Sequence, residues 1–185
     1  MHEDFENKLA WGKEGEQQIV AMLNRKGFIV AYTGPASQKD PIPSIWLPEV
    51  LHADPLIAPD LFVTQRIPPP SAIDPCSFYV EVKRYSHWTW NFKEHEWQTG
   101  MSVRHFFNYC SVQKFMGYPV TIYIIMEGEP SPQRRMIPTP SGVYAAPLHN
   151  LEVTARQYMD TMWWSIEEFN LLCTLEELRP MVVPA

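Results

Sequence analysis

Hydrophobic residues recur at helical spacing in two stretches of the chain. In residues 4–26 an apolar stripe ends at Leu23, and Gly27 follows as a typical helix end. In residues 102–116 a second stripe includes Phe106, and a Gly-Tyr-Pro sequence follows it. Both stripes indicate amphipathic helices that bury one face.

Apolar and β-branched runs predict strands between and after these helices. Residues 28–32 form a short run of this kind. Residues 60–65 and 78–85 form a pair with a proline-rich connection, which favours a hairpin with a long loop. Residues 120–126 are almost continuously apolar, as is typical of a strand covered on both faces.

The C-terminal part predicts a strand at about 142–146 and a last helix at about 165–178, because Ser165 precedes acidic residues suited to a first turn. The resulting order is helix, three strands, helix, strand and a tail. We therefore expect an α/β fold in which a central mixed β-sheet is flanked by helices, with an α-β-β-β-α-β core.

Composition narrows the class of protein. With 185 residues, 45% of them hydrophobic, the chain can bury one core and is too short for two full domains. We expect neither a membrane-spanning helix nor a secretory signal, since no apolar run is long enough. Three dispersed cysteines without a CxxC pair favour a reducing, cytoplasmic location. The net charge of −6 counts mildly against coating of nucleic acid, but it does not exclude an enzyme whose own carboxylates hold metal ions.

Charged residues interrupt the apolar strand at 78–85. Alternate strand residues share a face, so Glu81 and Lys83 lie together. Taken alone, this pattern is typical of an ion pair on the solvent face of an edge strand. Pairing with the preceding strand would bring Asp60 toward Glu81, however. Two converging carboxylates beside a lysine form an oxygen-ligand site suited to Mg²⁺.

A third carboxylate lies on the first helix. Glu16 precedes Ile19 and Val20 by one helical turn, so it extends the apolar stripe and should face the body of the protein. Glu14 projects off that stripe and is the weaker candidate. The alternative is that the stripe ends before Glu16, which would then lie at a solvated rim.

These residues resemble the PD-(D/E)XK nuclease superfamily of restriction-endonuclease-like and resolvase-like proteins. The superfamily places an acidic residue on the first helix, an Asp at a strand start and a (D/E)-x-K triplet on the next strand. The matching residues are Gly12, Gly15, Glu16, Pro59, Asp60, Glu81, Val82 and Lys83. The following helix carries Tyr109 and Gln113, in the reverse of the order typical of archaeal junction resolvases.

The resemblance spans about residues 14–126. It implies a single nuclease-like domain over residues 1–185, with a proline-rich insert at about 35–58 and a C-terminal extension after about 127. It also implies a deoxyribonuclease that depends on Mg²⁺ or Mn²⁺, with DNA as its partner, no membrane association, and a single chain or a homodimer as the active form.

The resemblance assigns roles to four side chains, namely Glu16, Asp60, Glu81 and Lys83. Asp60, Glu81 and the backbone carbonyl of Val82 would hold the metal ion. Lys83 would orient the attacking water or stabilise developing negative charge. Glu16 would hold a second metal ion or a water bound to it.

A surface for nucleic acid is expected in residues 82–118, which hold five basic side chains and two acidic ones. Aromatic residues are interleaved with them, either as stacking platforms for bases or as part of the core. His87, His95 and His105 could contact phosphate, but none has the spacing of a metal ligand. The expected nucleic-acid-binding residues are Arg84, Lys93, Arg104, Tyr109, Gln113 and Lys114.

Two other functions are compatible with the sequence. A catalytically silent nuclease-fold module could act in binding or assembly, for example in a phage or mobile element, and the acidic charge fits this reading. A hydrolase could instead use Glu14 or Glu16 with Glu81 as an acid/base pair. That third reading leaves Lys83 without a role.

Overall fold

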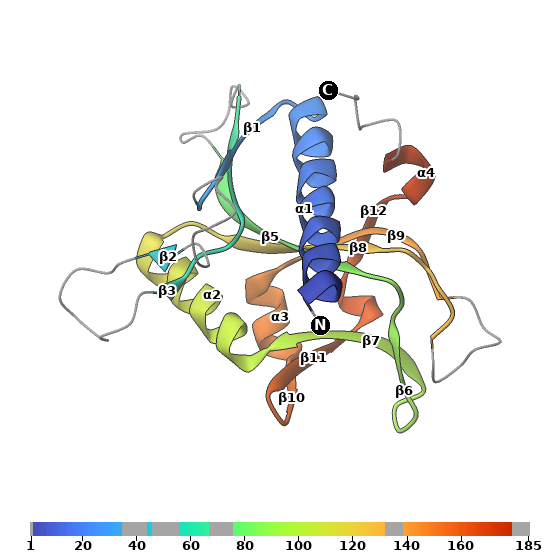
Figure 1. The fold of residues 1–185 in the computed structure, drawn as a ribbon. Helices are drawn as coiled ribbons and strands as arrows, with labels where there is room; N and C mark the ends of the chain where they lie inside the picture. The colour runs from blue at the N-terminus through green and yellow to red at the C-terminus, as the bar shows by residue number, and fades with distance from the viewer. Residues whose placement is uncertain (1, 35–43, 46–55, 67–75, 132–138, 179–185) are drawn as a thin grey trace.

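The computed structural model of the protein describes residues 2–34, 44–45, 56–66, 76–131 and 139–178. Within them a six-stranded sheet has the order β1-β4-β5-β8-β9-β12 (Figure 1). Its strands are β1 (Phe28–Tyr32), β4 (Leu61–Gln65), β5 (Ser77–Tyr85), β8 (Val120–Met126), β9 (Gly142–Pro147) and β12 (Asn170–Cys173). The β5–β8 pair is parallel and the other pairs are antiparallel.

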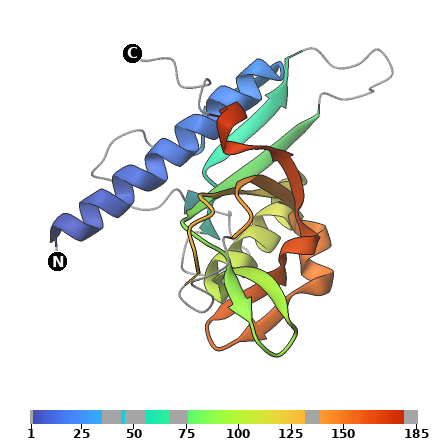
Figure 2. The same cartoon turned by 90° about the vertical axis from the view of Figure 1, so that its right-hand side faces the viewer.

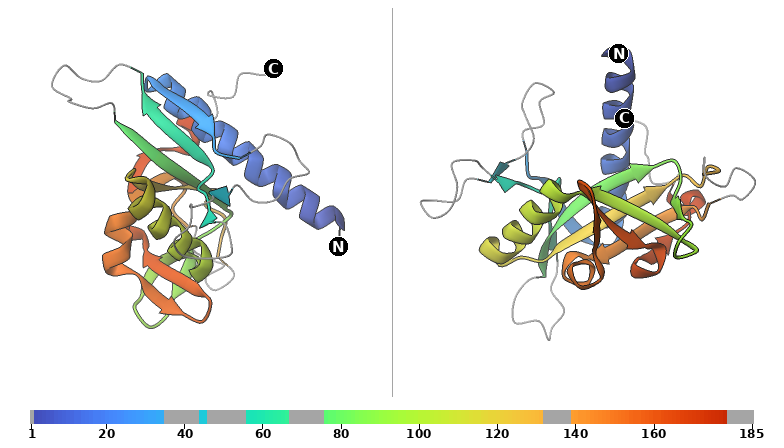
Figure 3. Two further views of the ribbon diagram at one scale, coloured as in Figure 1. Left: turned by 90° about the vertical axis from the view of Figure 1, so that its left-hand side faces the viewer. Right: turned by 90° about the horizontal axis from the view of Figure 1, so that it is seen from below.

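Helices cover both faces of this mixed sheet, which confirms the predicted fold class. The helix α1 (His2–Arg25) lies on one face, and α2 (Val103–Met116) and α3 (Leu148–Thr154) lie on the other (Figure 2). A second sheet, β10-β11-β7-β6, lies on the α2 side (Figure 3). Its strands are β6 (Thr89–Asn91), β7 (Glu96–Ser102), β10 (Arg156–Tyr158) and β11 (Thr161–Ser165).

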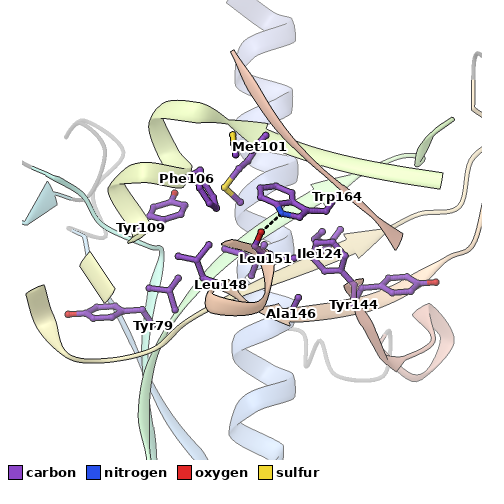
Figure 4. Close-up of a cluster of buried hydrophobic side chains, with 14 of the residues drawn as sticks. Tyr79, Met101, Phe106, Tyr109, Ile124, Tyr144, Ala146, Leu148, Leu151 and Trp164 are labelled. Atoms are coloured by element: carbon purple, nitrogen blue, oxygen red, sulfur yellow. Dashed lines mark hydrogen bonds between the residues drawn. The ribbon is translucent and has the colours of Figure 1, made fainter. Parts of the chain in front are cut away.

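Two hydrophobic clusters hold these layers together. On the α1 side, Ile19 and Leu23 pack against Val80 and Val82 of β5. On the α2 side, the cluster includes aromatic residues and the leucines of α3 (Figure 4). There the Trp164 indole N–H donates to the Leu151 carbonyl at 2.8 Å, so this buried ring keeps a hydrogen-bond partner. Burial of both faces explains why β8 is apolar along almost its whole length.

Both ends of α2 are fixed by local contacts. The Ser102 side chain accepts a hydrogen bond from the His105 backbone N–H, which caps the helix start. Gly117 ends the helix with φ of 73°, a conformation that side chains with a Cβ disfavour. The Gln113 side-chain oxygen accepts from the Val120 N–H at 3.0 Å, so the helix end is tied to the start of β8.

The predicted hairpin is present, with Leu61 paired with Val80. The helices predicted at 4–26 and 102–116 and the strands at 28–32, 120–126 and 142–146 are also confirmed, within one to two residues. Most of the predicted insert lies outside the described residues, apart from β2 (Ser44–Ile45) and β3 (Leu56–Ile57), which pair with each other.

The last helix, predicted over 165–178, is wrong. Ser165 does cap a helical start by accepting a hydrogen bond from the Glu167 N–H, but only the short 3-10 helix η1 (Ile166–Glu168) follows. The chain then forms β12 along the edge of β9, where strand pairing satisfies the backbone, before α4 (Leu175–Leu178). Residues after 127 thus supply two strands of the main sheet.

In the part of the chain that the structure describes, no helix combines the length and the apolar character needed to cross a membrane.

Candidate active site

The candidate site lies where β4 ends beside β5. Antiparallel pairing of the two strands ends at Leu61 and Val80, and β5 continues to Tyr85. Asp60 stands just before β4, and its Oδ2 accepts a hydrogen bond from the Val82 N–H at 2.8 Å. The carboxylate therefore replaces the next bond of the ladder. We call this place, formed by Asp60, Glu81, Val82 and Lys83, the β5 notch.

The backbone carbonyl of Val82 faces the same side of β5. In a strand, the N–H and C=O groups of one residue point toward the same neighbour. The Val82 N–H points to Asp60, so the Val82 carbonyl points to the notch as well. The notch thus gathers carboxylate and carbonyl oxygens from two strands.

Glu81 is buried and only partly satisfied. Its side chain is 2% exposed, and its Oε1 forms an ion pair with the Lys83 ammonium group. In the described part of the chain, the second oxygen, Oε2, is buried without a hydrogen-bond partner. Because β5 lies between β4 and β8, the alternative of a surface ion pair on an edge strand is excluded. An orphaned carboxylate oxygen is costly unless a ligand or cation completes it.

The charges of the notch perturb one another. Burial raises the pKa of Asp60 well above its ordinary value, and the Glu81 carboxylate raises it further, while Lys83 and the Val82 N–H oppose this shift. Burial alone would lower the pKa of Lys83, but Glu81 and Asp60 outweigh it and raise that pKa. Lys83 therefore stays cationic. Burial and the neighbouring Glu81 carboxylate disfavour the ionised form of Asp60.

Glu16 approaches the notch from α1. Burial, followed by the Glu81 carboxylate, raises the pKa of Glu16, and Lys83 acts in the opposite direction. Glu14 is instead 55% exposed at its side chain and forms an ion pair with Arg84. Glu16 thus lies within electrostatic range of Asp60, Glu81 and Lys83, whereas the Glu14 side chain is bound to Arg84.

Neighbours that the sequence did not assign to the site complete it. Thr33 holds the Asp60 segment, since its N–H donates to the Asp60 carbonyl at 3.0 Å and its hydroxyl contacts the carbonyls of Pro59 and Asp60. Burial, followed by the Glu16 and Asp60 carboxylates, raises the pKa of Tyr32 at the end of β1. These contacts depend on the pairing of β1 with β4, which local sequence does not reveal.

The α2 side of the notch carries His105, Tyr109 and Tyr85. Burial, and next the positive charge of Lys83, lower the pKa of His105, whose ring contacts that of Tyr109. Tyr109 is buried, and burial together with the Glu81 carboxylate raises its pKa. The Tyr85 hydroxyl donates to the Gly100 carbonyl at 2.9 Å, which ties β5 to β7. Helical spacing from Tyr109 is the sequence signal that could have placed His105 here.

Three of the six expected nucleic-acid-binding residues have exposed side chains, namely Lys93, Arg104 and Lys114. The other three, Arg84, Tyr109 and Gln113, are buried or bound within the protein. Tyr109 is 1% exposed, and the Gln113 side chain binds the start of β8. Burial and these contacts leave Tyr109 little surface for phosphate, so we do not keep it in the proposed interface.

Arg84 anchors α1 to the sheet. Its side chain is 10% exposed and forms ion pairs with Glu14 at 2.8 Å and Glu127 at 2.7 Å. It also donates to the Trp11 carbonyl and stacks on the Trp11 ring at 4.9 Å. This structural role removes Arg84 from the set available to phosphate groups.

The interleaved aromatic residues divide between core and surface. Trp88 is fully buried and donates to the Pro140 carbonyl. Trp90 and Trp97 pack edge to face across β6 and β7 at 4.8 Å. Phe92 is 62% exposed at the β6–β7 turn. Trp88 is therefore part of the core, whereas Phe92 is on the surface.

The donor set of the notch fits a hard divalent cation in part. Two carboxylates, a backbone carbonyl and the orphaned Glu81 Oε2 are oxygen donors of the kind that Mg²⁺ takes together with water. Within the described residues, no group of three or more His, Cys, Asp and Glu side chains forms a ready-made metal site. A cation here would therefore rely on the carbonyl and on water as well as on Asp60 and Glu81.

Comparison with known proteins bears on the fold. No family model matches the chain, and no curated protein sequence matches it. The arrangement of α1, the β4–β5 hairpin, α2 and β8 is that of a resolvase-like, restriction-endonuclease-like fold. A solved structure with this fold is Hjc, a Holliday junction resolvase from the archaeal hyperthermophile Archaeoglobus fulgidus. The TM-score is 0.50 at 12% sequence identity, over 90% of this chain and 98% of Hjc.

Proposed function

We propose that the protein is a metal-dependent nuclease that hydrolyses phosphodiester bonds in DNA. The observation that carries the proposal is the β5 notch, where a buried carboxylate with an orphaned oxygen lies beside a second carboxylate and a lysine. Burial of charged groups in a strand costs stability, and proteins commonly retain such a cost where the groups serve a function. The fold shared with a Holliday junction resolvase supports the same class of chemistry.

The residues of the notch have distinct roles in this proposal. Asp60, Glu81 and the Val82 carbonyl would hold a Mg²⁺ or Mn²⁺ ion, and Glu16 would help to hold a second ion or its water. The bound cation supplies charge neutralisation at the phosphate and activation of water. Lys83, held in place by Glu81, donates a hydrogen bond to the attacking water or to a phosphate oxygen as negative charge builds up.

The neighbours of the notch keep this set in position. Thr33 fixes the backbone of Pro59 and Asp60, so the Asp60 carboxylate stays on the Val82 N–H. Tyr109 belongs to, and Tyr85 packs against, the hydrophobic cluster on the α2 side of β5, the face that carries Glu81 and Lys83. Burial of Glu81 strengthens the electrostatic interaction of the ion pair.

DNA would reach the notch along exposed cations. Lys93, Arg104 and Lys114 are on the surface, and phosphate contacts of this kind give affinity without sequence preference. Homodimer formation stays a prediction, and light scattering on the purified protein measures it directly.

The test is cleavage of supercoiled plasmid, single-stranded DNA and branched DNA with Mg²⁺ or Mn²⁺. We expect nicking that excess EDTA abolishes and that Glu81→Gln and Lys83→Met reduce by about 10²-fold or more. Full activity in EDTA, or undiminished activity of Glu81→Gln, would contradict the proposal. DNA binding without cleavage under all these conditions would favour the catalytically silent module instead.

The chain provides a matched control on α1. Glu16→Gln and Glu14→Gln remove the same charge two residues apart, but only Glu16 is coupled to the notch. We expect Glu16→Gln to lower the cleavage rate. Glu14→Gln should leave it within about twofold of wild type, because the glutamine amide oxygen can still accept the hydrogen bond from Arg84 that holds α1. Equal effects of the two substitutions would indicate a general charge effect and remove Glu16 from the catalytic set.

A further inference from the structure

Tyr32 stands at the edge of the β5 notch without being needed by the core. It is the last residue of β1, and it pairs with Leu61, the residue after Asp60. The next residue, Thr33, binds the Asp60 carbonyl. The backbone that carries Tyr32 is therefore fixed to the backbone that carries Asp60.

The Tyr32 ring lies on the α1 face but extends beyond its cover. Alternate residues share a face, so Tyr32 lies on the side of Phe28 and Val30, which pack into the cluster under α1. Those two side chains are half-buried, whereas Tyr32 is 47% exposed. A large ring held on a fixed strand end with nearly half its surface open is poorly explained by packing alone.

Tyr32 lies within electrostatic range of the acidic notch, because burial, followed by the carboxylates of Glu16 and Asp60, raises its pKa. A tyrosine phenol, whose ordinary pKa is about 10, is neutral near pH 7 in any case. A phosphodiester that enters this acidic site gains no attraction from charge here, but a flat neutral ring can bind a nucleobase.

On the basis of the proposed nuclease function, we propose that Tyr32 stacks on a nucleobase next to the scissile phosphate, which makes DNA with an unpaired nucleotide at that position the preferred substrate. A base within a duplex has both faces covered by its neighbours, so only an unpaired or displaced base can lie on the ring. Single-stranded and branched DNA offer such bases, and an intact duplex does not.

The test compares Tyr32→Ala, Tyr32→Phe and Ile29→Ala. Ile29 is the matched control, because it lies on the same strand with a similar exposed fraction of 55% and points to the opposite face. Each variant is first checked by thermal melting for an intact fold. Binding of a fluorescent single-stranded oligonucleotide is measured in EDTA, and cleavage of single-stranded, branched and blunt duplex DNA is measured with Mg²⁺.

We expect Tyr32→Ala to weaken oligonucleotide binding by about tenfold and to raise KM with little change in kcat, since one base–aromatic stack is lost. Tyr32→Phe and Ile29→Ala should bind like wild type, and binding to blunt duplex should change less than about twofold. If Tyr32→Phe binds as weakly as Tyr32→Ala, the hydroxyl and not the ring binds DNA, and the inference fails. The inference also fails if the wild-type protein cleaves DNA and Tyr32→Ala binds the oligonucleotide as tightly as Ile29→Ala does. If wild type neither binds nor cleaves DNA, the nuclease proposal itself fails.

Discussion

Asp60→Asn should abolish cleavage and yet stabilise the fold. The asparagine oxygen can still accept the hydrogen bond that Val82 donates to Asp60 at 2.8 Å. The negative charge next to Glu81 disappears, however, and this charge is what burial and Glu81 disfavour in the folded state. Lys83 keeps Glu81 as its ion-pair partner, so no cation is left unpaired.

The size of the gain follows from the direction of the Asp60 shift and from the chain length. Removal of a functional but destabilising group commonly adds about 0.5–2 kcal/mol to the free energy of unfolding. For a chain of this length, about 1 kcal/mol corresponds to a rise in Tm of roughly 2–4 °C. A rise of this order is readily measured by calorimetry near neutral pH.

The pH dependence has a definite sign. The folded-state pKa of Asp60 is raised, so between the unfolded-state pKa and the folded-state pKa the folded protein binds more protons than the unfolded one. Wild-type stability therefore increases as the pH falls through the folded-state pKa of Asp60. The advantage of Asp60→Asn should be greatest near neutral pH and should shrink as the pH approaches about 4.

A divalent cation should reverse this order of stability. A ligand that binds only the folded state at about 100 times its Kd adds about 2.7 kcal/mol, or roughly 5–10 °C in Tm for this chain length. Mn²⁺ should raise the Tm of wild type in this way and leave Asp60→Asn nearly unchanged. Calorimetric scans of wild type and Asp60→Asn, each in EDTA and in Mn²⁺, give the four Tm values. A lower Tm of Asp60→Asn in EDTA, or an equal response of both proteins to Mn²⁺, would refute the reasoning.

Further substitutions, measured by urea unfolding, test the contacts that hold α1 and α2 on the sheet. Arg84→Ala should lower the free energy of unfolding by about 2 kcal/mol, because charge-assisted hydrogen bonds of a nearly buried guanidinium are lost; a loss below about 0.5 kcal/mol would contradict its anchoring role. Gly12→Ala should stabilise α1 by up to about 1 kcal/mol, since a Cβ there meets no atom within 4 Å. Gly15→Ala should gain clearly less, since a Cβ there lies 3.3 Å from side chains of β5 and β8 that must move aside. Equal effects at the two glycines would show that α1 does not pack on the sheet as described. Gln113→Ala should cost about 1 kcal/mol by removing the acceptor of the Val120 N–H, and an unchanged urea midpoint would exclude that bond.

The sequence was sufficient for the parts of the fold that depend on local periodicity. The apolar run of β8 and the alternation of β5 indicate strands, and the proline-rich connection indicates that β4 and β5 pair. Pairing of Leu61 with Val80 then brings Asp60 next to Glu81 without further information. The core of the candidate site could be predicted for this reason.

The second sheet was missed because its strands lack such a signal. β6 and β10 have three residues each, and every residue of β6 is half-buried while every residue of β10 is exposed. Neither the apolar alternation of a half-buried strand nor a continuous apolar run is present. Their pairing with β7 and β11 is set by tertiary contacts, in which Trp164 and Met162 of β11 enter the core.

The strand period already indicates that Arg84 has a structural contact on the face opposite Lys83. Lys83 and Arg84 are consecutive, so they lie on opposite faces of β5. If Lys83 faces the notch, Arg84 faces α1, where Trp11 and Glu14 bind it. A count of basic residues along the chain cannot replace their assignment to faces.

The two faces of β5 thus carry out linked tasks. On one face Glu81 and Lys83 form the ion pair of the β5 notch, and on the other Arg84 holds α1 close to the sheet. Close approach is possible because Gly15 presents no side chain to Arg84, and the next residue of the helix is Glu16. The contacts that fix α1 therefore also determine how near the Glu16 carboxylate comes to Glu81. If the proposed nuclease function is correct, the packing of this strand and the placement of Glu16 both depend on the position of one helix.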